Sequence, residues 1–142
     1  MYPYINLSDK TEITYAENIS QNNSFNLNQM TIDRVKEEVT EMIKAETGDA
    51  LKSIILYGSC ARGDYNDDSD IDIAVLLDAD RSGVEDYLDG MSLIATKLAL
   101  KYIVVANIIC LPYEEYLNKR TWYKFFRNID REGEILYGTE VL

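Results

Sequence analysis

Hydrophobic residues recur along the chain with two different periods, and the two periods alternate. Between Thr31 and Gly48 they return every three or four residues, which is the spacing of one helix face. Ser53 to Tyr57 is instead a short apolar run, typical of a buried strand. The pattern after Tyr57 predicts a helical turn at 60–63, a strand at 70–77, a helix at 82–101, a strand at 103–111, helices at 112–118 and 122–132, and an extended segment at 134–137.

Strands separated by helices predict an α/β fold, with a short mixed β-sheet flanked by helices. A chain of 142 residues is long enough for one domain with its own core. The first 30 residues differ from the rest because they are rich in Asn, Ser and Gln. We therefore expect a polar N-terminal extension at 1–30, either a flexible arm or one with a short strand at 12–15, followed by a folded domain at 31–142.

The strand predicted at 70–77 has two unlike faces. Its odd-numbered residues, from Ile71 to Leu77, are all apolar, whereas its even-numbered residues begin with Asp70 and Asp72 and continue with Ala74 and Leu76. Alternate residues of a strand point to the same side, so the two carboxylates share a face with their Cα atoms roughly 6.5–7 Å apart. The strand is expected to begin in a polar cleft and to end beneath a helix.

A glycine and a serine follow the strand predicted at 53–57. Gly58 lets the backbone approach a ligand closely, and Ser59 can offer a hydroxyl and a backbone N–H to a phosphate. The helical turn at 60–63 starts beside them, and helix N-termini attract phosphate. Paired carboxylates such as Asp70 and Asp72 suit Mg²⁺, which prefers oxygen ligands and substrate phosphates. The pattern predicts a site for a metal-bound nucleotide.

These residues also resemble a known signature. The string Gly-Ser-Cys-Ala-Arg-Gly…Ser-Asp-Ile-Asp-Ile-Ala-Val is similar to the Gly-Ser-x10-Asp-x-Asp motif of the polymerase-β-like nucleotidyltransferases, and most of all to their minimal, MNT-type members. Residues 125–137 resemble the C-terminal end of the same family, so the resemblance runs from about 31 to 138. It implies the nucleotidyltransferase fold, transfer of a nucleoside monophosphate from ATP or another NTP to a hydroxyl, and two Mg²⁺ ions.

The resemblance also implies roles for individual residues. Asp70 and Asp72 would be the catalytic residues that hold Mg²⁺, and Gly58 and Ser59 would bind the β and γ phosphates. Arg62 would either neutralise phosphate charge or form an ion pair with one of the many nearby acids.

A third carboxylate, usual in this family on the next core strand, is missing. The segment 103–111 carries no acid, and Asn107 is its only polar residue. Asn107 either stands at the position of the third acid, where an amide can ligate a cation but cannot act as a base, or is a hydrogen-bonded buried amide. If the acid is absent, a group such as Asp64, Asp67 or Asp68, or one on a partner, must deprotonate the acceptor.

Composition narrows the chemistry further. The chain has 25 acidic and 14 basic residues, a formal charge of −11, which disfavours a nucleic-acid substrate and fits a small molecule or protein acceptor better. It has no histidine, which excludes Ser-His-Asp and Cys-His catalysis and histidine-based zinc sites. Cys60 and Cys110 form no disulfide framework, and Cys60 is interpreted as a small buried residue. The sequence contains no signal-peptide pattern and no long apolar run, so we expect a cytoplasmic protein without a membrane segment.

Two interpretations fit the aromatic residues at 122–126, which are Trp122, Tyr123, Phe125 and Phe126. Their helical spacing favours a core-facing stripe, and the alternative is a patch that faces a partner.

Three functions remain open from the sequence. The first is an adenylyltransferase that modifies a hydroxyl of a protein partner; the resemblance implies that such small chains act as antitoxins of HEPN-domain toxins. The second is a catalytically weak nucleotide-binding module that neutralises its partner by contact, which the Asn107 strand favours. The third is an antibiotic nucleotidyltransferase, although those enzymes usually carry an extra helical domain.

Overall fold

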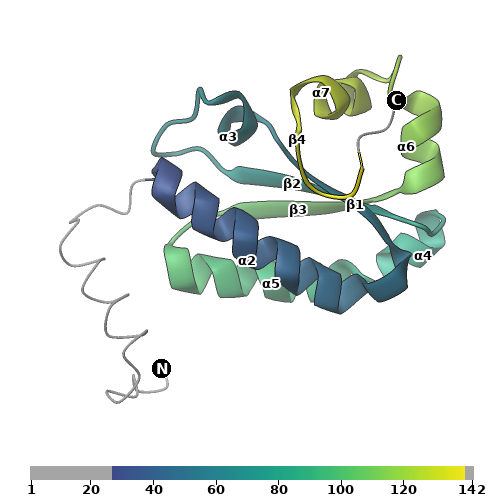
Figure 1. Cartoon of the computed structure of the whole chain (residues 1–142). Helices are drawn as coiled ribbons and strands as arrows, with labels where there is room; N and C mark the ends of the chain where they lie inside the picture. Colours follow the sequence, from purple (N-terminus) through teal and green to yellow (C-terminus); the bar gives the residue numbers. More distant parts are fainter. Residues whose placement is uncertain (1–26, 140–142) are drawn as a thin grey trace.

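A four-stranded mixed sheet forms the centre of the molecule, and helices cover both of its faces (Figure 1). The computed structural model describes residues 27–139. Strand β1 (Leu51–Tyr57) lies between β2 (Ile71–Leu77) and β4 (Glu134–Tyr137) and is antiparallel to both. Strand β3 (Ala106–Pro112) runs parallel to β2 at the sheet edge, which gives the order β3-β2-β1-β4. The predicted α/β class with a short mixed sheet is confirmed.

The helices divide between the two faces of the sheet. Figure 1 shows α2 (Gln29–Thr47) and α5 (Leu88–Tyr102) on one face, and α6 (Tyr113–Lys119) and α7 (Lys124–Glu132) on the other. The short helical elements are η1 (Gly48–Ala50), α3 (Ser59–Arg62) and α4 (Arg81–Glu85). None of the helices within 27–139 is long and apolar enough to cross a bilayer.

Strand β2 is the centre of the core because it is buried on both faces over most of its length. Its odd-numbered residues pack with α2 and α5 in one cluster. Ala74 and Leu76, on the other face, pack with residues of α6 and α7. Burial on that second face decreases toward the start of the strand, where Asp72 is half-buried and Asp70 is exposed. The strand therefore begins in a polar, accessible position and ends beneath helices, as predicted.

Helix α2 starts two residues earlier than predicted because Asn28 caps it. The Asn28 Oδ1 accepts a hydrogen bond from the Thr31 amide at 2.9 Å, as side-chain oxygens at helix N-caps do. Gly48 ends the helix at a positive φ of 55°, as predicted. The arm and the strand expected at 12–15 lie outside the described residues, and the division at residue 30 stays a prediction.

The single helix predicted at 82–101 is wrong: the structure has two helices, α4 and α5. The amides of Asp86 and Tyr87 bond to the carbonyls of Gly83 and Val84, three residues back, which tightens the chain between the two helices. The phase of α5 changes as a result. Ile94 is buried with Met91 and Leu98, whereas Leu88 is 48% exposed.

The other predicted element boundaries agree with the structure to within two residues, except for the start of the third strand. The third strand begins at Ala106 rather than Ile103, since Ile103 closes α5 with a left-handed φ of 56°. Strand β1 begins two residues before its predicted start, and α7 begins two residues after its own. Strand β4 has the predicted bounds.

Candidate functional site

Three polar side chains from two neighbouring strands meet at the start of β2. The Asn107 Nδ2 donates hydrogen bonds to Asp70 Oδ2 at 3.0 Å and to Asp72 Oδ1 at 3.2 Å. The parallel register makes this possible because Asn107 is the direct partner of Asp72. Asn107 is exposed, so the reading of it as a buried amide is wrong. Both predicted carboxylates lie within hydrogen-bond reach of one atom.

Gly58 lies directly against Asp72. A Cβ added to Gly58 would come within 2.6 Å of Asp72 Oδ2, and the residue has a positive φ of 74°. A side chain is therefore excluded twice, by the backbone conformation and by the carboxylate. The sequence suggested that a glycine here admits a ligand, but the group that approaches most closely is the chain's own aspartate.

The turn after Gly58 leaves two backbone donors available. Ser59 begins α3, and the amides of Ala61 and Arg62 bond to the Gly58 carbonyl. The Ser59 and Cys60 amides are the first two of this turn, so they have no acceptor within it. The predicted helical turn is confirmed with a shift of one residue; Gly58 lies against Asp72, and Ser59 is the next residue and the first of α3.

Cys60 contributes to the local structure and is not placed as a nucleophile. It is buried, and its Sγ donates to the Asp70 carbonyl oxygen at 3.4 Å. Burial raises the pKa of its thiol, and the Asp72 charge raises that pKa further, which disfavours the thiolate a nucleophile needs. Cys60 thus joins α3 to the residue that precedes β2.

Arg62 forms ion pairs, one of the two roles the sequence allowed. Its Nε lies 3.2 Å from Asp64 Oδ2, and its Nη1 lies 3.0 Å from Glu132 Oε2. The second contact joins α3 to the end of α7, seventy residues later in the chain. A phosphate at this arginine would have to compete with two carboxylates.

Tyr57 belongs to the site, although the sequence did not single it out. It is the antiparallel partner of Asp72, and its ring meets that of Phe125 edge to face, with centroids 5.9 Å apart. Burial raises the pKa of Tyr57 to about 12, with a further contribution from the Asp72 charge. The sequence shows that Tyr57 ends the apolar strand β1, but not that it lies opposite Asp72. The register between two strands cannot be derived from one sequence.

The electrostatics of Asp72 favour a cation. Burial raises the pKa of this carboxyl most; the Asn107 hydrogen bond lowers it, the Asp70 charge raises it and the Arg62 charge lowers it. A bound cation would offset both the burial and the repulsion from Asp70. No cluster of three or more acidic, histidine or cysteine side chains suited to a metal exists within 27–139, so the donor set is two carboxylates and one amide. The carboxylate oxygens fit Mg²⁺, and the amide would add a third oxygen ligand only with its Oδ1, rather than its Nδ2, toward the cation.

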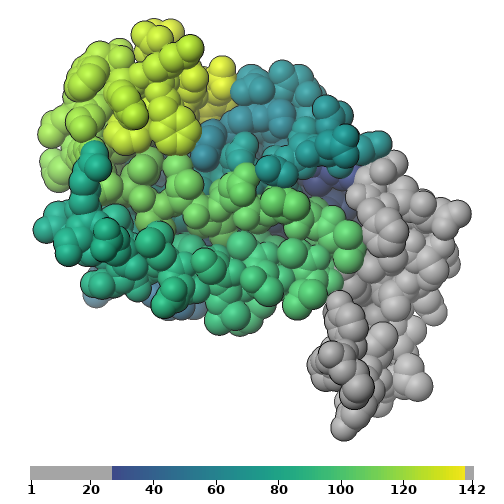
Figure 2. Space-filling model, turned by 180° about the vertical axis from the view of Figure 1, so that it is seen from behind, coloured from purple at the N-terminus to yellow at the C-terminus, as the bar shows by residue number. Residues whose placement is uncertain are grey.

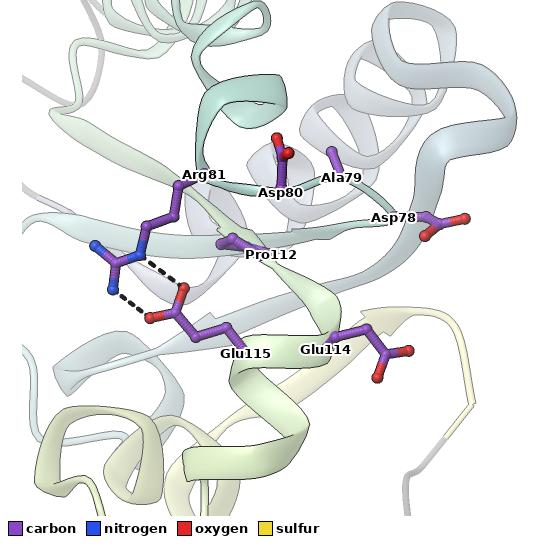
Figure 3. A pocket seen from close by; sticks show the side chains of 7 residues that line it. All are labelled: Asp78, Ala79, Asp80, Arg81, Pro112, Glu114 and Glu115. Carbon is purple, nitrogen blue, oxygen red and sulfur yellow. Dashed lines mark hydrogen bonds and ion pairs between the residues drawn. The ribbon is translucent and has the colours of Figure 1, made fainter.

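A separate acidic hollow of about 430 Å³ lies at the opposite end of β2 and β3 (Figure 3). Three of its five charged groups are already engaged: Arg81 bonds to Glu115, and Asp80 caps α4 through the Gly83 amide. None of the predicted site residues lines it. The residues that do are Asp78, Ala79, Asp80, Arg81, Pro112, Glu114 and Glu115.

Known proteins resemble this chain over most of its length. Residues 32–130 match the family model described as "Nucleotidyltransferase domain". A Methanocaldococcus jannaschii protein named "Putative protein adenylyltransferase" is 41% identical over 108 residues, which are 76% of this chain and 100% of that protein. A second protein so named from that organism is 34% identical over 79 residues, 55% of this chain and 74% of its own.

Solved structures show weaker likeness. A toxin–antitoxin structure with AMP-PNP is 23% identical, covers 74% of each chain and has a TM-score of 0.49. A complex of a tri-AMPylated Shewanella oneidensis HEPN toxin with an MNT antitoxin is 21% identical, covers 76% of this chain and 73% of that chain, and has a TM-score of 0.45. At these scores the likenesses carry no weight for function.

The contact between Gly58 and Asp72 can be separated from backbone strain. Gly63 also has a positive φ, 88°, but a Cβ there would meet nothing within 4 Å. Gly63→Ala should therefore cost only the left-handed strain, about 1–2 kcal/mol, and Gly58→Ala should cost more. Chemical denaturation measures both. In an Asp72→Ala background the cost of Gly58→Ala should decrease but stay above that of Gly63→Ala, because Gly58 (φ 74°, ψ −157°) has a backbone conformation that only glycine adopts easily, whereas Gly63 is in the ordinary left-handed region; an unchanged cost would show that the carboxylate contact is unimportant.

The raised pKa of Asp72 predicts a pH dependence of stability. A carboxyl whose pKa is higher in the folded state contributes stability below its ordinary value of 3.8, and that contribution is lost as pH rises through the folded-state pKa. Asp72→Asn cannot ionise, so without divalent cations it should raise Tm at pH 7 and give no gain at pH values below about 3.8. Asp67→Asn, in the exposed loop, is the control. A lower Tm for Asp72→Asn at pH 7 would contradict the prediction.

Proposed function

The chain belongs to the nucleotidyltransferase domain family, and we propose that it transfers AMP from ATP to a hydroxyl of a protein partner. The observation that carries the proposal is the convergence of Asp70 and Asp72 on one atom beside the Gly58–Ser59 turn. The relative that is 41% identical and named for protein adenylylation supports the choice of acceptor class.

Each site residue has a role in this proposal. Asp70 and Asp72 would hold Mg²⁺, with the Asn107 amide turned so that its oxygen faces the cation. When bound, Mg²⁺ neutralises triphosphate charge and favours ionisation of the attacking hydroxyl. The free amides of Ser59 and Cys60, with the Ser59 hydroxyl, would bind the terminal phosphates. Asp72 would be kept ionised by the cation despite its partly buried position.

Two arguments together support a protein as the acceptor: the net charge of the chain and its resemblance to known proteins. A net charge of −11 disfavours a polyanionic acceptor and is compatible with a small molecule or a protein; the name of the 41% identical relative favours the protein. We extend the proposal to a HEPN-type toxin as the partner, which this chain would inhibit as its antitoxin. That extension depends on the resemblance of residues 58–75 to MNT-type chains.

A second function is favoured by one observation. Asn107 occupies the strand position beside both carboxylates, and an amide cannot accept a proton from the acceptor. A protein with this site can bind a nucleotide and neutralise its partner by contact, without turnover.

Nucleotide binding should require both aspartates. Replacing Asp70 and Asp72 with Ala removes the carboxylates but leaves the apolar face of β2 unchanged, so the fold should persist. Calorimetry with ATP and Mg²⁺ should then show a loss of affinity of roughly a hundredfold or more. The matched control, Asp67→Ala with Asp68→Ala in the exposed loop, has the same change in net charge and should bind normally. Equal affinity in the two double variants would refute the site.

Asn107→Asp distinguishes the two functions. A carboxylate at this position lies within reach of both aspartates, and a well-placed general base is worth on the order of 10²–10⁴-fold in rate. We expect a modest rate of labelled AMP transfer by the wild type and a higher rate by the variant, with lower stability when Mg²⁺ is absent. Asn118→Asp, on exposed α6, controls for the added charge. If neither protein transfers AMP but both inhibit the partner, the contact mechanism is correct and the transferase proposal is wrong.

A further inference from the structure

One face of α7 is basic on an otherwise acidic molecule, with Lys124 and Arg131 exposed and Arg127 half-buried. Lys124, Arg127 and Arg131 recur three and four residues apart, so they share one side of the helix. No described acid lies within ion-pair distance of these three, although the chain has 25 acidic residues. This face is therefore an uncompensated positive region.

Aromatic side chains lie next to these cations. Trp122 is 63% exposed, Tyr123 46% and Phe125 40%. The Trp122 Nε1 donates to the Asn118 carbonyl at 3.2 Å, and its ring meets that of Tyr123 at 6.2 Å, so its position is fixed before any partner binds. Exposed Trp, Tyr and Arg side chains are typical of protein interfaces. We call the six residues Trp122, Tyr123, Lys124, Phe125, Arg127 and Arg131 the α7 surface.

The α7 surface is continuous with the candidate site. The Phe125 ring contacts the Tyr57 ring, and Tyr57 is paired with Asp72 across the sheet. At its other end α7 reaches the site through the ion pair of Glu132 with Arg62. In Figure 2 the yellow-green atoms of α6 and α7 form an exposed corner of the molecule near the blue-green atoms that follow β1. A molecule that covers this corner is held beside the carboxylates.

We propose that the α7 surface docks an acidic segment of the protein that supplies the acceptor hydroxyl. This proposal rests on the proposed function, since it names the acceptor's chemistry and its docking surface. Acidic side chains of the partner would pair with Lys124, Arg127 and Arg131, and apolar or aromatic ones would pack on Trp122 and Phe125. A nucleic acid fits less well, because its backbone carries a charge at every nucleotide and would extend past these three cations over the acidic remainder of the chain, whereas an acidic segment of a protein can be short.

A fluorescent peptide with one tyrosine between runs of glutamate tests the docking without ATP. The variant Lys124→Gln with Arg127→Gln and Arg131→Gln should weaken its binding, measured by anisotropy, by roughly tenfold or more. The matched control, Lys44→Gln with Lys52→Gln and Lys97→Gln, has the same change in net charge on exposed residues elsewhere and should bind normally. Trp122→Ala tests the aromatic part with one substitution, and Tm measurements verify that each variant folds.

Calorimetry with ATP separates this proposal from the proposed function. Normal ATP binding by the α7 triple variant, together with lost peptide binding, supports the docking surface. Peptide binding that is absent, or equal in both triple variants, overturns it. Binding of a single-stranded oligonucleotide that requires the α7 cations, with no binding of the peptide, would also overturn it and assign the surface to nucleic acid. If the peptide docks but Asp70→Ala with Asp72→Ala leaves ATP binding intact, the nucleotide site fails and the docking surface remains.

Discussion

Two carboxylates held side by side, with one of them half-buried, are the constraint around which the candidate site is built. Asp70 and Asp72 repel each other, and burial makes the charge of Asp72 more costly. Three local features hold them in place: the Asn107 amide donates to both, Gly58 leaves room for an Asp72 oxygen, and the Cys60 thiol holds the carbonyl of Asp70. The charge of Asp72 therefore costs the folded state stability, as the polar groups of functional sites often do, and a bound cation would offset that cost.

The position of the two carboxylates near the Gly58–Ser59 turn can be predicted from the sequence, because the residues involved are close together in the chain. A glycine–serine turn and two acids on one strand face lie within fifteen residues, so period-two alternation alone places the carboxylates together. The apolar face of β2, the stripe of α2 and the bounds of β4 follow from periodicity and glycines in the same way.

Features that depend on register or on distant contacts were not predictable. Tyr57 lies at the site because β1 pairs with β2 at one particular register, and Phe125 comes from a helix almost seventy residues later. The aromatic group at 122–126 illustrates the limit, because helical spacing could not separate the buried Phe126 from the exposed Trp122. The break between α4 and α5 was not predictable for a related reason. The Asp86 amide bonds to a carbonyl three residues back, which shifts the phase of the following helix, and no proline marks this point.

The order of the strands has a consequence for synthesis of the protein. The carboxylates, Gly58 and Asn107 all precede Pro112, so the ribosome releases them before α7 and β4 are made. Until then Ile55 and Leu76, which α7 covers in the finished fold, remain exposed to water. Strand β4 must also return to pair with β1, with Ile135 opposite Ile55, before the sheet has its fourth strand. A nascent chain that stops short of β4 therefore carries the acidic end of the site on an incomplete, aggregation-prone core.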